Sequence, residues 1–480
     1  GPKHPATKYY EKRKNKTNIN TQRKHGTTTN PERATKRDRE KRKTKYQYQL
    51  TQFNYYNQRR KAIRAVTETH KPSCKINKNL VYNYYMSHFS LENNNIRQEY
   101  ISSVSESERV ELNDLFPTQV SKQEVASVVS RMAVDTAPGP DHVLMRIVKD
   151  DMVMEIISLI TTLMLKSGHV PSIFKQARTV LIYKKGDINN IKNWRPISIC
   201  SVVRRVVERI LDKRLRQYVS FNINQRGFTN SPGNLINTSL LNSVLAEAKT
   251  KRGDATVVFL DISKAFDNIG HLHLRNTLNS LPILSKLSTL IMNLQEHNST
   301  RIKVNHEKTA PIEIHRDVMQ GSPLSPALYN LATDHILNEL SEDEIANHYG
   351  YHLVPGLLPL TVLGFADDTV LIANNHHSAL ELTRMVVYSF KEIGLEINFD
   401  KCAIINISKG KLKQTNFPIF EDINIPCIVP DECVPYLGVN FADSCVFDPQ
   451  DTLTNLKIQL DLLSSSPLLL PDQKFHIIKS

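Results

Sequence analysis

The chain has 480 residues, of which 40% are hydrophobic and 23% charged, so it can form two or three packed units and disorder cannot dominate it. The most apolar run, Met152–Leu165, contains Glu155 and is too short to cross a bilayer. No signal peptide opens the chain, so we expect no membrane association. Six scattered cysteines without a CxxC pair predict reduced, structural thiols.

The net charge of +14 is concentrated in the first segment. Residues 1–64 contain 20 Lys and Arg against 4 Asp and Glu, whereas the rest of the chain contains 42 against 44. We therefore expect residues 1–45 to form a disordered basic arm, which either binds nucleic-acid phosphates or is a solvated leader with a nuclear-import run. The first residue is Gly, which suggests a processed, excised or incomplete reading frame.

The first half of the chain predicts mainly helices. Ser121–Glu124 matches a capping box, and Ala137–Asp141 forces a turn. The expected elements are helices over Tyr46–Glu68, Ser121–Ala133, Asp150–Ser167 and Ser198–Val219, and a strand over Thr179–Lys184. The helix over Ser198–Val219 has one apolar face, and its other face carries cations that contact either phosphates or solvent, namely Arg204, Arg205, Arg209, Lys213 and Arg216.

The second half alternates strands and helices. This order predicts an α+β fold with a split βαβ sheet and helices on one face. The expected strands are Thr256–Ile262, Arg301–Asn305, Thr361–Ala366, Thr369–Ala373, Leu395–Phe399 and Ala403–Ile407, and the expected helices are His273–Asn279, Leu284–Glu296, Ser325–Leu340, Ser378–Ile393 and a short helical tail from Pro449.

Three acids stand at the ends of apolar strands. Asp261 follows Phe259-Leu260, and Asp367 and Asp368 lie at the tip of a predicted hairpin. An acid in an apolar strand costs several kcal/mol unless it is neutralised. Hard carboxylate ligands on neighbouring strands suit Mg²⁺, which also uses substrate phosphates as ligands. An Asp-Asp hairpin alone is explained equally well by an ordinary turn, but the upstream acidic strand end favours a two-metal site for phosphoryl transfer.

A series of motifs in order makes this interpretation specific. The sequence from Pro138 to Phe441 resembles the reverse transcriptase of a non-LTR (LINE-type) retrotransposon, within the group that encodes a restriction-like endonuclease. The motifs that carry the resemblance are Ala137-Pro-Gly-Pro-Asp141, Arg178–Lys184, Asn193-Trp-Arg-Pro-Ile-Ser198, Gln225-Arg-Gly-Phe228, Asp261–Phe266, Gln320-Gly-Ser-Pro-Leu-Ser-Pro326, Phe365-Ala-Asp-Asp368, Gly394–Lys401 and Tyr436-Leu-Gly-Val439.

The resemblance implies a role for each matched residue. Asp261, Asp367 and Asp368, with the Ile262 carbonyl, would hold two Mg²⁺ ions, with Mn²⁺ able to substitute. Residues that would contact the incoming nucleotide are Lys184, Arg195, Phe266, Gln320 and Gly321, with Tyr436, Leu437 and Gly438 as the primer grip. Guanidinium forks suit phosphates, and a glycine permits close backbone approach.

Two of these roles have a plain alternative. Phe266 would exclude ribonucleotides by a clash with the sugar 2′-position, or it is an ordinary core residue. Lys401 would donate a proton to pyrophosphate, or it is a surface lysine at the end of a strand. Two motifs depart from the commoner pattern, with Ser322 in place of Asp and Phe365 in place of Tyr.

The resemblance also implies the architecture and partners. We expect a right-hand polymerase with a ferredoxin-like split βαβ palm, divided into a disordered basic arm (1–45), an N-terminal extension (46–120), fingers (121–250), a palm (251–441) and a partial helical thumb (442–480). The partners would be an RNA template, a DNA primer or target, and dNTPs, in the nucleus and, during ribonucleoprotein assembly, in the cytoplasm. The zinc fingers and endonuclease of such elements are not recognisable in this sequence.

Two alternatives stay open. One is a truncated, non-catalytic remnant that binds nucleic acid, favoured by the short segment after Phe441. The other is a polymerase of the group II intron maturase or telomerase type, which the sequences around Arg178 and Asn193–Ser198 argue against.

Overall fold

The computed structural model describes residues 36–57, 59–67, 72–89, 117–283, 285–305, 307–421, 423–443, 445–446 and 449–479. These residues fall into two compact units. One unit contains the first two and the last two of the described helices, and the other spans Pro72–Val446. Within the described ranges, no helix combines the length and apolarity needed to cross a membrane.

The smaller unit joins segments from both ends of the sequence. Tyr55 and Ala62 pack with Leu463, Leu469 and Ile477 in a small apolar core. Its helices are α2 (Lys36–Asn57), α3 (Arg59–Thr67), α16 (Pro449–Ser465) and α17 (Pro471–Lys479). The helical tail is confirmed, and the single helix expected over Tyr46–Glu68 is instead two helices, α2 and α3. Disorder up to residue 45 is wrong for residues 36–45, which are helical; the rest of the basic arm lies outside the described residues.

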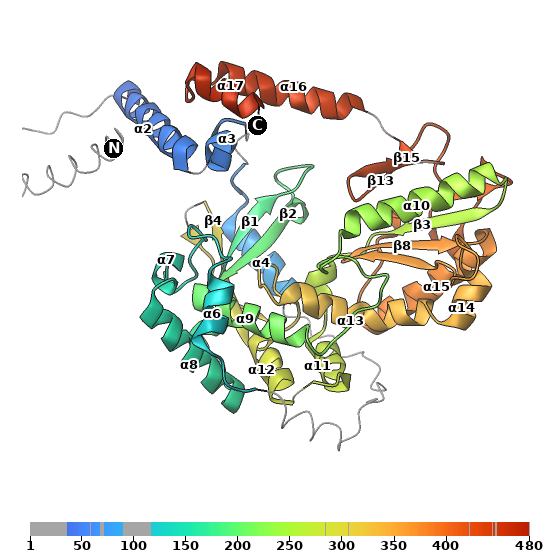
Figure 1. The fold of residues 1–480 in the computed structure, drawn as a ribbon, viewed down its shortest axis with the longest axis horizontal. Helices are drawn as coiled ribbons and strands as arrows, with labels where there is room; N and C mark the ends of the chain where they lie inside the picture. Colours follow the sequence, from blue (N-terminus) through green and yellow to red (C-terminus); the bar gives the residue numbers. More distant parts are fainter. Residues whose placement is uncertain are drawn as a thin grey trace, which may run out of the picture. The chain divides into compact units, whose positions relative to one another are not determined.

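The larger unit contains a five-stranded antiparallel sheet with helices on both faces (Figure 1). The strand order is β10-β9-β3-β8-β7. Its elements are β3 (Ala255–Leu260), β7 (Val362–Phe365), β8 (Asp368–Ala373), β9 (Ala403–Ser408), β10 (Lys411–Leu412), α10 (Gly233–Thr250), α13 (Ser325–Leu340), α14 (Asp343–Tyr349) and α15 (His376–Glu392). The chain order β3, α13, β7, β8, α15, β9 is the expected split βαβ arrangement.

Strand β3 shows why this sheet has two covered faces. Its six residues are all buried, and successive side chains point to opposite faces. Val258 and Leu260 pack in the core that contains α13 and α15, whereas Val257 and Phe259 pack in the core that contains α10. The expectation of helices on one face is therefore wrong, because α10 covers the other face.

A second sheet is built from β1 (Gln176–Tyr183), β2 (Trp194–Cys200), β4 (Asn298–Val304), β5 (Glu307–Lys308) and β6 (Ile312–Ile314). Strand β1 pairs antiparallel with β2 and parallel with β4. The strands β1 and β4 lie on opposite sides of the predicted fingers–palm boundary at residue 250, yet they pair in one sheet. The boundary therefore does not separate two sheets, and it stays a prediction. Helix α4 (Lys78–Phe89) packs on this sheet through Val81, Tyr85 and Phe89.

The other helices of the larger unit follow local sequence signals, and most of them pack in the core that contains α13 and α15. They are α6 (Lys122–Val129), α7 (Met145–Val148), α8 (Asp151–Ser167), α9 (Val202–Leu215), α11 (His271–Ser280) and α12 (Ser285–Gln295). Ser121 caps α6 by accepting a hydrogen bond from the Glu124 amide, and Asp150 caps α8 by accepting hydrogen bonds from the amides of Met152 and Val153.

Two predicted elements are wrong. The helix expected from Ser198 begins at Val202, because Trp194–Cys200 pairs with β1 as a strand. The strand expected over Leu395–Phe399 contributes only one bridge, between Ile397 and Ile262, and is followed by the short helix η4 (Phe399–Lys401).

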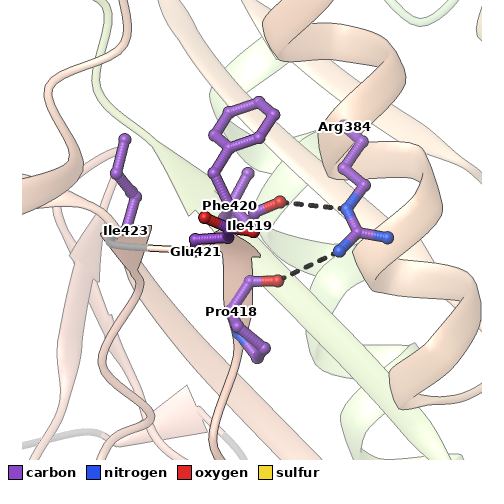
Figure 2. Close-up of a pocket in the computed structure, with 6 residues that line it drawn as sticks. All are labelled: Arg384, Pro418, Ile419, Phe420, Glu421 and Ile423. Carbon is purple, nitrogen blue, oxygen red and sulfur yellow. Dashed lines mark hydrogen bonds between the residues drawn. The ribbon is translucent and has the colours of Figure 1, made fainter.

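The remaining strands form two small sheets, β11 (Pro418–Phe420) with β12 (Ile423–Asn424), and β13 (Val434–Tyr436) with β14 (Val439–Phe441) and β15 (Cys445–Val446). Arg384 of α15 fixes the first of these by donating hydrogen bonds to the carbonyls of Ile419 and Pro418, at 3.0 and 3.4 Å (Figure 2). A shallow pocket lies there, and it contains none of the predicted site residues.

Candidate active site

The Asp367–Asp368 pair lies on the hairpin between β7 and β8. Phe365 pairs with Asp368, so Ala366 and Asp367 are the two residues of the turn. Ala366 has φ +57°, the left-handed conformation that tight two-residue hairpins require. Both aspartates are exposed at the end of a sheet whose neighbouring residues, Thr369 and Val370, are buried.

Asp261 comes next to this hairpin because of the strand register. Strands β3 and β8 pair up to Leu260 and Thr369, and the next residues on the two strands are Asp261 and Asp368. Just after β3, Ile262 forms an isolated antiparallel bridge with Ile397. At this bridge the Asp261 carbonyl accepts a hydrogen bond from the Asn398 amide at 2.8 Å. The Ile262 carbonyl takes no part in the hydrogen bonds of that bridge.

The three carboxylates influence one another electrostatically. Desolvation raises the pKa of Asp368 to about 6, and the charges of Asp367 and Asp261 add to the shift. Desolvation also raises the pKa of Asp367, with a contribution from Asp261. Among the described residues, no three His, Cys, Asp or Glu side chains are close enough to hold a metal ion by themselves. Asp261, Asp367 and Asp368 are thus neighbours that do not by themselves form a complete metal-binding site. A metal ion bound there would need further ligands, such as substrate phosphates.

Lys401 contacts this acidic group directly. Its Nζ lies 3.2 Å from Asp261 Oδ2, and 65% of the lysine side chain is exposed. Lys401 lies on η4 rather than at the end of a strand. In this arrangement it partly compensates the charge of Asp261.

Asp261 and Asp367 line a cleft of about 1100 Å³. Lys184 and Arg195 of the β1–β2 hairpin line the same cleft, and their charges partly offset the rise that desolvation causes in the pKa of Asp367. Burial and the neighbouring Arg195 lower the pKa of Lys184. Cations facing acids across a cleft can bind a polyphosphate and its counter-ions together.

Phe266 lies on the wall of the same cleft. Its ring stacks on Tyr329 with centroids 4.6 Å apart, and Phe228 contacts it edge-on at 6.3 Å. The residue is half-buried, so one part of the ring belongs to the core and another faces the cleft. The packing of the ring fits the core interpretation, and exclusion of ribonucleotides stays a prediction.

Gln320 and Gly321 also line the cleft. The Gln320 carbonyl accepts a hydrogen bond from the Ser198 amide at 2.8 Å. Gly321 has φ +113°, and a Cβ there would lie 2.4 Å from the Ser198 carbonyl oxygen. Only glycine permits this close approach of the two segments.

The predicted primer-grip residues form the β13–β14 turn. Leu437 and Gly438 both have positive φ, as a two-residue hairpin of the primed type requires. The Tyr436 ring packs on Phe259 of the sheet, and its hydroxyl accepts a hydrogen bond from Asn237 at 3.1 Å. These residues lie outside the lining of the cleft.

The sequence did not predict how the acidic hairpin is supported. Gln225 Oε1 accepts hydrogen bonds from the amides of Ala366 and Gly227, at 2.8 and 3.0 Å. Backbone bonds join Asn224 and Arg226 to Gly364 on the same hairpin. The motif Gln225-Arg-Gly-Phe228 was the available signal, but the resemblance gave it no role.

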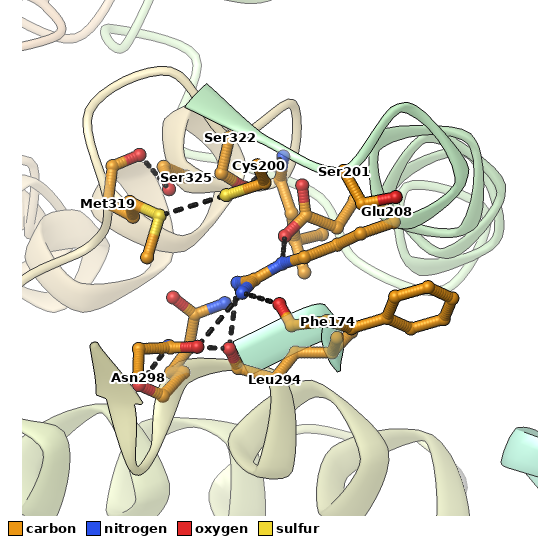
Figure 3. A network of polar contacts seen from close by, with 12 residues as sticks. Phe174, Cys200, Ser201, Glu208, Leu294, Asn298, Met319, Ser322 and Ser325 are labelled. Atoms are coloured by element: carbon orange, nitrogen blue, oxygen red, sulfur yellow. Dashed lines mark hydrogen bonds and ion pairs between the residues drawn. The ribbon is translucent and has the colours of Figure 1, made fainter. Parts of the chain in front are cut away.

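A buried polar network supports the loop that carries Gln320. Arg204 is fully buried, and it donates to Glu208, to Asn298 and to the carbonyls of Phe174 and Leu294 (Figure 3). The prediction that Arg204 faces solvent or phosphates is wrong. The Cys200 thiol contacts the Met319 sulfur at 3.1 Å, which links strand β2 to the residue before Gln320.

Comparison with known proteins agrees with this geometry. Residues 182–441, more than half of the chain, match the family described as "Reverse transcriptase (RNA-dependent DNA polymerase)". The Pol polyprotein from type-1 retrotransposable element R2 of Popillia japonica is 34% identical over 65% of this chain and 44% of that protein. That from type-2 element R2DM of Drosophila melanogaster is 30% identical over 65% of this chain and 29% of that protein.

The chain thus spans less than half the length of these relatives. Among solved structures, apo telomerase from Candida Tropicalis, truncated from its C-terminal domain, matches 58% of this chain and 56% of that chain at 15% identity and a TM-score of 0.38. The predicted resemblance to non-LTR retrotransposon reverse transcriptases and the α+β polymerase fold are confirmed. Enzymes of this kind generally use divalent metal ions and act on a nucleic-acid template, a primer and dNTPs. The chain belongs to the reverse transcriptase family.

Proposed function

We propose that this chain is an RNA-directed DNA polymerase, which extends the 3′-hydroxyl of a primer along an RNA template. The observation that carries the proposal is the placing of Asp261, Asp367 and Asp368 on adjoining strand ends, with Asp261 and Asp367 lining one cleft together with Lys184 and Arg195. Acids on one side and cations on the other match the needs of phosphoryl transfer, in which charge on a triphosphate must be held and neutralised.

We propose Mg²⁺ as the metal, with Mn²⁺ able to substitute. The side chains of Asp261, Asp367 and Asp368 and the carbonyl of Ile262 would hold two ions, together with substrate phosphates. Such ions would activate the primer hydroxyl and stabilise the leaving pyrophosphate. The residues fit this role because they offer hard oxygen ligands. Desolvation, and after it the charges of the neighbouring aspartates, raises the pKa values of Asp367 and Asp368, and a bound cation would offset both effects.

The other residues would bind and orient substrates. Lys184 and Arg195 would hold the triphosphate, and Gln320 and Gly321 would contact the nucleotide and the templating base. Tyr436–Gly438 would hold the primer. Lys401 would give a proton to pyrophosphate; its bond to Asp261 means that it first has to leave that carboxylate.

The raised pKa of Asp368 predicts a pH dependence of metal affinity. Below about pH 6 this carboxyl holds a proton, which competes with Mg²⁺, and above it the group is anionic. We expect the KM for Mg²⁺ to rise about tenfold from pH 7 to pH 5. Primer extension rates over a range of Mg²⁺ concentrations at each pH measure this, and a KM that does not change with pH contradicts it.

Substitution of Phe266 tests selection of the sugar. The ring stacks on Tyr329 and lines the cleft, and in our proposal it would clash with a 2′-hydroxyl of the incoming nucleotide. Phe266→Val is expected to raise ribonucleotide incorporation relative to dNTP incorporation by about tenfold or more. Single-nucleotide extension with rNTP and dNTP measures the ratio, and an unchanged ratio would leave Phe266 a core residue only.

We further propose that this polymerase acts in target-primed integration in the nucleus, after cytoplasmic assembly with its RNA. A DNA-binding domain and a restriction-like endonuclease would be supplied by other parts of the element. The arm of residues 1–45 would add phosphate contacts. The sequence encoded next to this chain in the element would test the endonuclease grouping directly.

Primer extension on poly(rA)/oligo(dT) with Mg²⁺ and dTTP tests the activity itself. The proposal expects template-dependent DNA synthesis by the unmodified chain. RNA binding without any synthesis, under Mg²⁺ and Mn²⁺ alike, would instead favour a non-catalytic remnant.

A further inference from the structure

Helix α4, which precedes all the recognised motifs, forms part of the wall of the cleft. Tyr84, Tyr85 and His88 line the cleft together with Asp267 and Gln320. The helix is fixed at its end, where the Phe89 carbonyl accepts a hydrogen bond from the His315 amide at 3.1 Å. Lys264, three residues before Asp267, places its ammonium 4.9 Å from the ring centroid of Tyr84.

The orientation of the His88 ring is set by Arg316. The guanidinium donates to the His88 carbonyl at 2.9 Å and contacts Nδ1 at 3.0 Å. Because arginine can only donate, Nδ1 is an acceptor and the neutral ring carries its hydrogen on Nε2. Burial, Lys264 and Arg316 lower the pKa of His88 to about 3, so the ring is neutral at ordinary pH. Nε2 is buried, has no hydrogen-bond partner, and lies 4.0 Å from Asp267 Oδ2.

Asp267 lies between His88 and Gln320. Only 6% of the residue is exposed. Its Oδ1 accepts a hydrogen bond from Gln320 Nε2 at 2.5 Å, while Oδ2 faces the ring of His88. Since the amide nitrogen of Gln320 is bound to Asp267, the amide oxygen points away from that carboxylate, and Gln320 itself lines the cleft.

We propose that Asp267, supported by His88 of α4, is a positioning residue that fixes the amide of Gln320 for contact with the incoming dNTP. The inference rests on the proposed function, because it assigns Gln320 to the nucleotide. A short hydrogen bond to a buried carboxyl oxygen, which solvent does not reach, holds one amide orientation in advance of binding. Without this hydrogen bond, the Gln320 amide has to be ordered when the nucleotide binds. Removal of the bond should therefore weaken nucleotide affinity more than it slows the chemical step.

Substitution of Asp267 tests the role by a KM-against-kcat comparison. Asp267→Ala is expected to raise the KM for dTTP about tenfold, with kcat within about threefold and the KM for Mg²⁺ unchanged. Because Asp267 acts through Gln320, Asp267→Ala should add little to the defect of Gln320→Ala. Additive effects of the two substitutions would overturn the proposal.

Substitution of His88 separates positioning from packing. His88→Leu removes the polar N–H that faces Asp267 Oδ2 at 4.0 Å and is expected to raise the KM for dTTP about threefold, whereas His88→Gln returns a polar N–H at a similar reach and should restore it. Equal defects in both variants, or none in either, would count against a role for the ring nitrogen.

A binding measurement separates failure of this inference from failure of the proposed function. Trp194 is the single tryptophan of the chain and lines the cleft, so its fluorescence can report dTTP binding. With poly(rA) and a dideoxy-terminated oligo(dT) primer no synthesis occurs, and Asp267→Ala should still weaken dTTP binding about tenfold. Unchanged dTTP affinity overturns the inference whether or not the unmodified chain synthesises DNA; weakened affinity supports it even if synthesis is absent.

Discussion

Asp367→Ala is expected to lower the rate of primer extension at least about a thousandfold while RNA binding is retained. Asp367 is the acid at the turn of the hairpin, beside Asp368 and within electrostatic reach of Asp261, Lys184 and Arg195. A metal ion supplies several kcal/mol of transition-state stabilisation, and about 4 kcal/mol corresponds to a thousandfold. The initial rate on poly(rA)/oligo(dT), with filter binding of the same RNA, measures both properties.

A matched control removes a charge elsewhere on the same unit. Glu344 is an exposed acid in the first turn of α14, and Glu344→Gln should leave both synthesis and RNA binding unchanged. The melting temperature of Asp367→Ala should not fall, because the substitution relieves repulsion among neighbouring acids. Synthesis at more than a tenth of the unmodified rate would show that Asp367 does not hold an essential ion.

Hydrophobic patterns within single helices and strands made the sheet that carries Asp261, Asp367 and Asp368 predictable. Ser325–Leu340 was placed within its true bounds because apolar residues recur at helical spacing after Pro326, at the start of the helix. Two apolar strands around an Asp-Asp pair predicted the β7–β8 hairpin, and a third apolar strand ending in Asp261 predicted its neighbour. These signals lie within single elements, and they arise because each element has to bury apolar side chains whichever segments it packs against.

Contacts between distant segments were not predictable in the same way. Arg204 has the spacing of a solvated cation on α9, yet it is buried because Glu208 and the carbonyls of Phe174 and Leu294 compensate its charge. Likewise, nothing in the sequence near His88 connects it to Asp267, 179 positions later. Polar partners brought together by the tertiary fold leave no periodic pattern, so a single sequence does not contain the signal.

Gly227→Ala is expected to reduce synthesis by about a hundredfold through displacement of the acidic hairpin. A Cβ at this position would lie 2.1 Å from the Ala366 amide nitrogen and 2.7 Å from the Phe365 carbonyl carbon. Both obstacles are backbone atoms, so one of the two segments has to move. The movement would break the hydrogen bonds of Gln225 to the amides of Ala366 and Gly227. A misplacement of about 1 Å in a catalytic group can cost about a hundredfold in rate.

Gly253→Ala is the matched control for Gly227→Ala. Gly253 has ordinary φ, and an added Cβ there comes no closer than 4.0 Å to any atom, so neither synthesis nor stability should change. Gln225→Ala should show a smaller defect of the same kind as Gly227→Ala, with a higher KM for Mg²⁺, because it frees the hairpin without forcing it to move. If Gly227→Ala lost stability but kept its rate and its KM for Mg²⁺ at a temperature where it is folded, the segment would support the fold alone. Full activity of Gly227→Ala would mean that Asp367 and Asp368 do not depend on the position of this turn.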